Sequence, residues 1–295
     1  MGVFLVASPR RSGGRVPTRA GAVFAALSLA ALIWCPPSGA GPLEGVAALP
    51  ELGGLSPEEQ GLAIFREKDR RESGYQDLRV DLEMILRDRR GAESRRELSI
   101  SQLEMQEDGD RLLVVFDTPK PIRGTALLSY SHVESPDDQW LYLPAQRRVK
   151  KIASRNKSGP FLGSEFAYED LALQEVEKFT YRLLAGESCG ASQCLRVERT
   201  PLDEYSGYSR QEVLLDAETL RVERIDYFDR HERPLKVLVN DGYELHEGRF
   251  WKPQRMFMEN VQTGKTTELV WREYEFDNGL DADRDFSTNA LMRAR

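Results

Sequence analysis

The sequence contains few of the residues that usually carry metal or nucleophilic chemistry. Among its 295 residues are three histidines and three cysteines. His132, His231 and His246 are far apart in the chain, and none has the spacing of a metal-binding pair. The chain also lacks a glycine-rich loop of the kind that binds phosphates. We therefore expect no metal site, no cofactor and no catalytic residue.

Two short motifs match hydrolase patterns but lack the required context. The segment "GESCG" at 186–190 fits G-x-S-x-G, a motif that works where a strand turns sharply into a helix. Here the next segment, "CLRVER", is typical of another strand. The segment "SRNK" at 154–157 fits S-x-x-K but lacks both companion motifs and a helix to join its two ends. Both matches are interpreted as coincidental.

The sequence also lacks an excess of positive charge. The full chain has a formal net charge of −7, with 41 basic and 48 acidic residues. Four of the basic residues are arginines near the N-terminus, so removal of that region would take the net charge to about −11. A nucleic-acid-binding protein needs a basic surface. Nucleic acid is therefore excluded as an expected partner.

Residues 1–40 have the three-part layout of a secretory signal. Four arginines and no acidic residue precede an apolar run from Ala20 to Trp34. The small residues Ser38 and Ala40 then suit a cut before Gly41. We predict a cleaved signal peptide over 1–40, and hence a periplasmic protein that is soluble when mature.

Two other interpretations of this region remain open. The apolar run has about fifteen residues whereas a membrane span needs roughly twenty, which makes an anchor the weaker interpretation. Cys35 raises the question of a lipoprotein, but Trp34 stands where a lipidation motif has a small residue. No later apolar run is long enough to cross a membrane.

The two cysteines that remain after the cut are Cys189 and Cys194, in "CGASQC". In an oxidising compartment a close, even pair favours a disulfide, here across a short loop between two strands. Two free thiols are the alternative. A metal site is disfavoured because no second group of cysteines or histidines accompanies the pair.

One helix is predicted after a flexible lead-in over 41–55. Ser56 is placed as its N-cap, Pro57 as its first residue, and Glu59 completes a capping box. Leu62, Ile64 and Phe65 would form its apolar face. The helix is suited to cover a curled sheet.

The rest of the chain is typical of β-strands. In 77–86, "DLRVDLEMIL", apolar and polar residues alternate, so that one face meets a core or cavity. Short polar turns join strand after strand, and no alternation of strands and helices appears. We predict a single, mainly β domain over 56–295, built as an antiparallel meander. Its apolar face can be covered if the sheet closes into a barrel, packs against a second sheet, or forms a curled antiparallel sheet around a helix and a ligand. The predicted strands are 77–86, 97–106, 111–116, 124–130, 139–143, 147–152, 178–184, 194–199, 209–216, 221–228, 234–245, 250–261 and 266–276.

Three stretches resemble one protein family. The central one, "WLYLPAQRRVKKIASRNKSGPFLGSEFAYEDL" at 140–171, contains the pattern F-x-G-S-[DE]-F-x-Y-E-D-L. The others are "FDTPKPIRGTALL" at 116–128, and "YFDRHERPLKVL" followed by "WKPQRMFMEN" at 227–260. Together they resemble the outer-membrane lipoprotein-sorting family, the LolA-like periplasmic proteins. One departure is the turn 229–236, which has His231-Glu232-Arg233 where similar proteins often have glycine.

The resemblance implies a half-open, LolA/LolB-like barrel with a few helices that cover an apolar cavity. It implies a carrier that shuttles lipids, or the acyl chains of lipoproteins, towards the outer membrane. The implied partners are an inner-membrane lipid exporter and an outer-membrane acceptor. Two alternatives are a lipid-acting hydrolase on the same scaffold and a non-catalytic component of an envelope complex.

Candidate sites follow from the strand pattern and from the family motif. We expect the basic residues to line the rim of the cavity, and the motif's aromatic residues to form a hinged flap over it. The alternative is that the basic residues form a solvated face paired with Glu165, Glu169 and Asp170, with the aromatic residues in an ordinary core. The cavity or flap candidates are Val80, Leu82, Met84, Trp140, Tyr142, Phe161, Phe166 and Tyr168, and the rim candidates are Arg147, Arg148, Lys150 and Lys151.

Overall fold

A computed structural model describes residues 52–189 and 192–293. The predicted signal peptide and residues 41–51 of the predicted lead-in lie outside these residues. The helices are α1 (Pro57–Glu72), α2 (Ala282–Asp285) and α3 (Thr288–Arg293), with 3₁₀ turns η1 (Lys120–Ile122), η2 (Pro144–Gln146), η3 (Ser154–Asn156), η4 (Phe161–Gly163), η5 (Tyr168–Leu171) and η6 (Val176–Lys178). Among the described residues no helix is both long and apolar enough to span a bilayer.

Strands make up about half of the described residues and helices far fewer, and the prediction of a mainly β protein is confirmed. Buried and more exposed residues alternate along the strands, as the alternation of apolar and polar residues in the sequence predicts. The strands are β1 (Asp77–Arg87), β2 (Glu93–Leu103), β3 (Arg111–Thr118), β4 (Ala126–Tyr130), β5 (Asp138–Leu143), β6 (Arg148–Lys151), β7 (Phe179–Cys189), β8 (Ser192–Pro201), β9 (Tyr208–Asp216), β10 (Val222–Asp229), β11 (Pro234–Asp241), β12 (Glu244–His246), β13 (Phe250–Lys252), β14 (Arg255–Asn260) and β15 (Lys265–Phe276).

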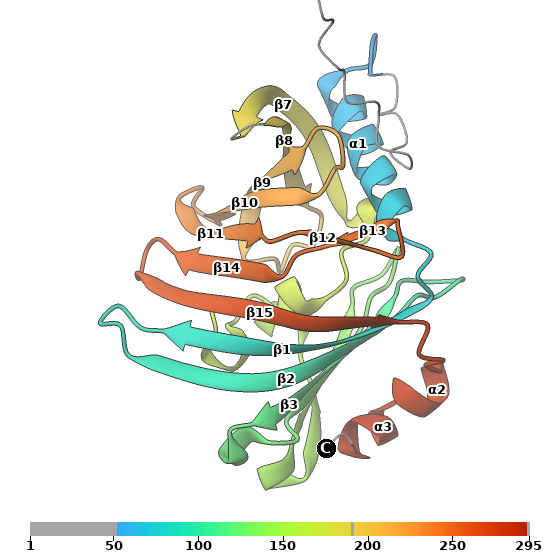
Figure 1. Cartoon of the computed structure of the whole chain (residues 1–295). Helices are drawn as coiled ribbons and strands as arrows, with labels where there is room; N and C mark the ends of the chain where they lie inside the picture. The colour runs from blue at the N-terminus through green and yellow to red at the C-terminus, as the bar shows by residue number, and fades with distance from the viewer. Residues whose placement is uncertain (1–51, 190–191, 294–295) are drawn as a thin grey trace, which may run out of the picture. The chain divides into compact units, whose positions relative to one another are not determined.

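Thirteen of these strands form one curled antiparallel sheet in the order β6-β5-β4-β3-β2-β1-β15-β14-β11-β10-β9-β8-β7 (Figure 1). Two antiparallel meanders are joined in its middle, where β1 pairs with β15 and Leu78 stands opposite Phe276. The edges are β6 and β7. The sheet therefore remains open, which confirms the predicted curled antiparallel fold.

Two predicted strands are each divided in the structure. The run 234–245 breaks at Gly242, whose φ of +65° suits glycine far better than other residues. The run 250–261 breaks at Pro253, between β13 and β14, because proline has no N–H to donate to a sheet. The short pieces β12 and β13 pair with each other in a separate two-stranded sheet.

The turn that departs from the family pattern is also resolved. Glu232 has a φ of +59° there, the left-handed conformation that glycine adopts without strain. Asp229 stabilises the turn, since its Oδ1 accepts hydrogen bonds from the backbone N–H groups of His231 and Arg233. The polar side chain of Asp229 thus maintains a conformation that glycine would favour on its own.

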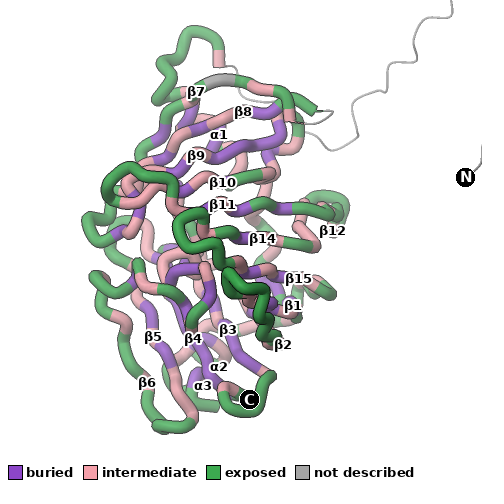
Figure 2. The backbone as a smooth tube through the Cα atoms, turned by 90° about the vertical axis from the view of Figure 1, so that its left-hand side faces the viewer, coloured by how far each residue is buried: buried purple, intermediate pink, exposed green. Residues whose placement is uncertain are grey.

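The two faces of the sheet carry separate cores. The inner face is defined here as the one covered by α1 and by residues 157–178, and its core includes Ile64, Leu82, Phe116 and Phe161. In Figure 2 buried positions recur along the strands between exposed turns. The alternation in the sequence thus corresponds to an inner face packed against helix and loop.

The outer face is covered at one end by the short helices α2 and α3, which the sequence did not predict. Phe286 and Leu291 are fully buried there against Ala126 and Leu128 of β4. The side chain of Asp281 caps α2 by accepting hydrogen bonds from two backbone N–H groups. Helices of four and six residues are too short to show a periodic pattern.

Helix α1 begins as predicted and packs closely on β7. The capping box is present, with Ser56 as N-cap and Glu59 bonded to its backbone N–H at 2.8 Å. The buried residues Gly61, Ile64 and Phe65 face the sheet. A Cβ atom on Gly61 would lie 2.8 Å from the backbone nitrogen of Arg182, so glycine permits this close approach.

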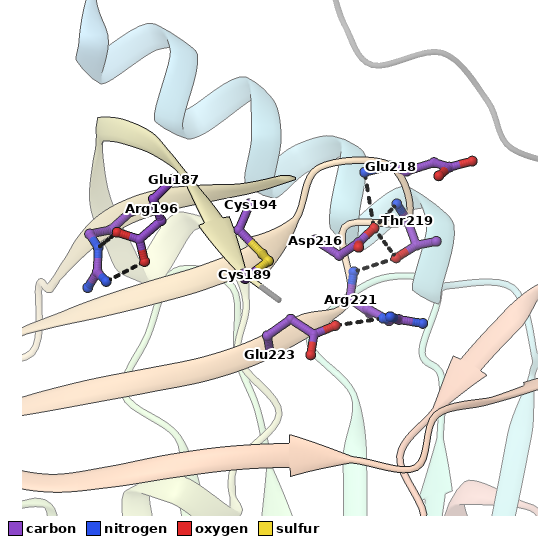
Figure 3. Close-up of a disulfide and its surroundings, with 9 residues drawn as sticks. All are labelled: Glu187, Cys189, Cys194, Arg196, Asp216, Glu218, Thr219, Arg221 and Glu223. Carbon is purple, nitrogen blue, oxygen red and sulfur yellow. Dashed lines mark hydrogen bonds and ion pairs between the residues drawn. A yellow bond between two sulfur atoms is a disulfide. The ribbon is translucent and has the colours of Figure 1, made fainter. Parts of the chain in front are cut away.

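The predicted disulfide is formed. Cys189 and Cys194 join the end of β7 to β8, with their Cα atoms 5.9 Å apart (Figure 3). Beside it, Arg196 forms an ion pair with Glu187 at 2.6 Å. In the chain-entropy model a loop this short contributes on the order of 2 kcal/mol to stability.

We predict that Gly61→Ala destabilises the fold, although alanine is the better helix former by about 1 kcal/mol. The added methyl group must displace either α1 or β7, and such overpacking costs about 1–3 kcal/mol. Urea unfolding measures the change. Gly53→Ala is the control, because a Cβ atom there meets nothing within 4 Å. A more stable Gly61→Ala variant would contradict the close packing.

Candidate functional site

Several strands carry polar residues at positions that point to the inner face. In β8, Leu195, Val197 and Arg199 are in the same phase of the alternation. In β11, Lys236 and Leu238 are likewise in phase, and both are buried. A polar residue in the apolar phase of a strand is costly to bury unless it is paired. These buried polar positions therefore indicate a candidate functional site on the inner face.

The register of the sheet aligns these residues into one row across six strands. Arg199 stands opposite Tyr181 on one side and Gln211 on the other, and Tyr227 links Gln211 to Lys236. We call this set the polar row. Its members are Tyr181, Arg199, Gln211, Tyr227, Lys236 and Asn260.

The next row on the same face, two residues further along each strand, is apolar. It runs from Val197 and Val213 through Ile225 and Leu238 to Met258. All five are at most 7% exposed. The inner face therefore has a single polar row bordered by an apolar surface.

The segment 157–178, called here the inner segment, contains the family motif and crosses the inner face. Lys236 Nζ donates to Asp170 Oδ2 at 2.6 Å and to the backbone oxygen of Glu165 at 2.9 Å. Asn260 Nδ2 donates to Glu165 Oε2 at 2.8 Å. Lys236 and Asp170 are both buried. Two of the six residues of the polar row, Lys236 and Asn260, thus fasten the inner segment to the sheet.

Further contacts fix the acidic end of the motif. Tyr208 Oη donates to Asp170 Oδ1 at 2.9 Å. Glu169 accepts hydrogen bonds from Ser206 Oγ at 2.7 Å and from the backbone N–H of Gly207 at 2.9 Å. Burial, with the nearby Asp170, raises the pKa of Glu169 to about 7. The motif therefore also holds the loop between β8 and β9.

A cavity of about 640 Å³ lies beside the inner segment, within the 300–1,000 Å³ or so that is typical of small-molecule sites. Its exposed lining residues include Pro136, Leu202 and Tyr205, which mark its mouth. Its buried lining residues include Phe166 and Leu238. Arg199, Gln211 and Tyr227 of the polar row also line the cavity.

Sequence reasoning did not identify Arg199, Gln211 or Lys236 as site residues. The signal was present, because "CLRVER", "SRQEVLL" and "PLKVL" each place a polar residue (Arg199, Gln211 and Lys236) in the apolar phase. The alignment of the three residues into one row depends on the cross-strand register, which the sequence does not state.

The structure disperses the eight predicted cavity or flap residues. Val80, Leu82 and Met84 are buried in the inner core, and none of them lines the cavity. Trp140 and Tyr142 lie on the outer face, in the core beneath α2 and α3, because β5 places Leu141 on the inner face instead.

The three motif residues lie together on the inner face. Phe161 is fully buried, and its ring centroid is 5.5 Å from that of Tyr168 and 5.6 Å from that of Phe116. Phe166 is also buried, and of the eight predicted residues it is the one that lines the cavity. A flap made of these residues must leave a packed core to open.

The four basic rim candidates do not line the cavity. Arg147, Arg148, Lys150 and Lys151 are exposed at or beside the edge strand β6. Lys151 pairs with Asp138 at 2.6 Å. The acidic motif residues named as alternative partners bind β11, β14 and the loop after β8 instead, since the inner segment turns away from β6.

The chain was compared with known proteins. A family model described as "Uncharacterized protein" matches residues 108–293. A putative outer membrane lipoprotein-sorting protein domain from Vibrio parahaemolyticus is 42% identical, with a TM-score of 0.78, over 80% of this chain and 100% of that one. A DUF1329 family protein from Desulfovibrio piger is 29% identical, with a TM-score of 0.75, over the same shares.

A third structure shares the fold at lower identity. It is a LolA superfamily protein from Nitrosomonas europaea, 17% identical with a TM-score of 0.63, over 80% of this chain and 99% of that one. No curated protein matches the sequence.

We predict that Asp170→Asn destabilises the protein by about 3 kcal/mol, because it leaves the buried Lys236 without its opposite charge. Urea unfolding monitored by circular dichroism measures the loss. Arg233→Ala is the control. It removes a pair with Asp229 whose arginine is 65% exposed, and such a pair is worth less than about 1 kcal/mol. Equal effects of the two substitutions would show that the buried pair does not fix the inner segment.

Proposed function

Because the chain belongs to the outer membrane lipoprotein-sorting protein family, we propose that it is a periplasmic carrier of lipid or of lipoprotein acyl chains. In this proposal residues 1–40 are a cleaved signal peptide. The mature protein takes its cargo from an inner-membrane lipid exporter and delivers it to an acceptor at the outer membrane.

The observation that carries this proposal is the cavity beside the inner segment, with its buried apolar lining. Phe166, Ile225, Leu238 and Met256 supply apolar surface on one side of it. A buried methylene group contributes about 0.8 kcal/mol, so a sixteen-carbon chain is held from water by on the order of 12 kcal/mol. A carrier must supply such a surface throughout transit.

The mouth of the cavity also suits a carrier, since cargo must leave again. It is formed by connections rather than by paired strands: residues 133–137, between β4 and β5, and residues 202–206, between β8 and β9. Loops rearrange at lower cost than the strands of a sheet. We propose that these loops and the aromatic residues of the inner segment move when cargo enters or leaves.

The same arrangement favours a carrier over a hydrolase. Ser188 of the G-x-S-x-G match lies in β7, paired with Gln193 of β8 in a hairpin. The motif requires a strand-to-helix turn that presents the serine above a sheet. We therefore propose that cargo is bound and released without chemical change.

The basic residues at 147–151 are proposed as a docking surface for an anionic membrane or an acidic partner. They are exposed at the edge of the sheet, and Val149 anchors their strand to the outer core. Arginine and lysine in such positions attract phosphate and carboxylate groups.

We predict that protein isolated from the periplasm without detergent carries lipid, detected by native mass spectrometry and solvent extraction. Leu238→Trp should fill the cavity and lower bound lipid severalfold while the fold is retained. Val239→Trp is the matched control, because the next residue of β11 points away from the inner core and is 38% exposed. If the parent contains no lipid and binds no fluorescent fatty-acid analogue, the carrier proposal fails.

The docking surface is tested by Arg148→Ala combined with Lys150→Ala. Both side chains are exposed, so folding and lipid content should remain as in the parent. Binding to vesicles that contain anionic lipid should weaken, and more at low salt than at high salt, because ions screen exposed charges. Arg224→Ala with Arg255→Ala is the control, since it removes the same charge elsewhere on the surface. Equal vesicle binding by all three proteins would refute the docking role.

A further inference from the structure

Two buried cations that line the cavity, Lys157 and Arg199, form no ion pair with a carboxylate among the described residues. Lys157 donates its hydrogen bond to the backbone oxygen of Asp137, whereas Arg199 has no such oxygen acceptor on the main chain of the described residues. Arg199 is 9% exposed, and its Nε donates to Oε1 of the neutral Gln211 at 2.7 Å. A buried charge without a partner is unfavourable, so an unpaired arginine in a cavity points to an anion supplied by a ligand.

The contrast with Lys236 in the same row shows what the protein does with a buried cation that has a structural role. Lys236 has its carboxylate, Asp170, at 2.6 Å. Arg199 has aromatic neighbours instead: its Cζ lies 4.7 Å from the ring centroid of Phe179 and 5.7 Å from that of Phe65. The rings hold the guanidinium in place and leave its terminal N–H groups for another acceptor.

The order of residues along the strands gives this cation a defined place. Pro201 and Leu202 follow Arg199 in the chain and lead to the mouth. In the other direction the neighbouring apolar row contributes Ile225 and Leu238. Rows two residues apart are separated by about 7 Å along a strand. Arg199 therefore lies between the mouth and the apolar end of the cavity.

We propose that the cavity selects an anionic amphiphile whose acid group binds Arg199 while its chain extends over Ile225, Leu238 and Met256. This inference rests on the proposed carrier function and assigns the chemical class of its cargo. The guanidinium fork matches the two oxygens of a carboxylate or of a phosphate monoester. Gln211 and Tyr227, the next two residues of the polar row after Arg199, supply further polar groups.

Acidic residues around the mouth, among them Glu134, Glu177 and Glu204, do not prevent this binding. All three are exposed, so salt and water screen their charges at distances beyond about 8 Å. Inside the cavity, Glu169 and Asp170 are occupied by Ser206, Gly207, Tyr208 and Lys236. Arg199 acts in the less polar interior, where a charged hydrogen bond is stronger.

The test compares ligands that share one chain length and differ in the head group. Dodecanoate, dodecyl phosphate and dodecanol each displace the neutral fluorescent probe N-phenyl-1-naphthylamine from delipidated full-length mature protein. A hydrogen bond to a charged group is worth roughly tenfold in affinity or more, so at least one acid should bind that much more tightly than the alcohol. The two acids distinguish a fatty acid from a phosphate-bearing lipid, and a preference for either supports the proposal.

Arg199→Gln should abolish the preference by weakening the preferred acid about tenfold while dodecanol changes less than about twofold. Arg196→Gln is the matched control, because this arginine lies on the other face of the same strand, paired with Glu187, and should keep the preference. If Arg199→Gln does not fold, the comparison of acid and alcohol binding by the parent protein still tests the proposal. Equal binding of acid and alcohol by the parent overturns the role of Arg199 and leaves the carrier intact, whereas no binding of any of the three refutes the carrier itself.

Discussion

The buried ion pair between Lys236 and Asp170 determines how the inner face is used. Each partner would be costly to bury alone, so the inner segment and β11 must come together or both charges must find water. The pair places the motif across the sheet, brings Phe166 against the core, and positions Glu169 to hold the loop after β8. The cavity lies beside this junction because the inner segment binds Lys236 and Asn260 and leaves Arg199, Gln211 and Tyr227 of the polar row to line the cavity.

Hydrophobic alternation and local capping were sufficient to predict the strands and the first helix, and the family resemblance implied the half-open curvature of the sheet. The period of "DLRVDLEMIL" became β1, Ser56 and Glu59 became a capping box, and the close cysteine pair became a disulfide. The site was less accessible from the sequence. Arg199 and Lys236 are neighbours only through a register across four strands, and the acid that binds Lys236 lies in a separate segment. Such interactions between distant parts of the chain leave no local pattern.

The basic strand β6 shows that residues close together in the sequence need not act together in the structure. Nearness in the sequence suggested that residues 147–151 and the acidic end of the motif act together, yet the inner segment between them turns onto the other half of the sheet. Trp140 and Tyr142 belong to the stretch that resembles the family and are predicted to line the cavity, but β5 turns them outwards beneath α2 and α3. A curled sheet has two faces that can both be buried, and alternation alone does not say which face meets a ligand.

The pairing of β1 with β15 has a consequence for how the molecule assembles. The first and last strands of the described sheet meet in its middle, so neither meander gains its central neighbour until residues 265–276 have emerged. Contacts so distant along the chain are formed slowly, because a long loop must close before any of them is made. Until the C-terminal strand arrives, β1 would have an unpaired edge that could pair with another chain.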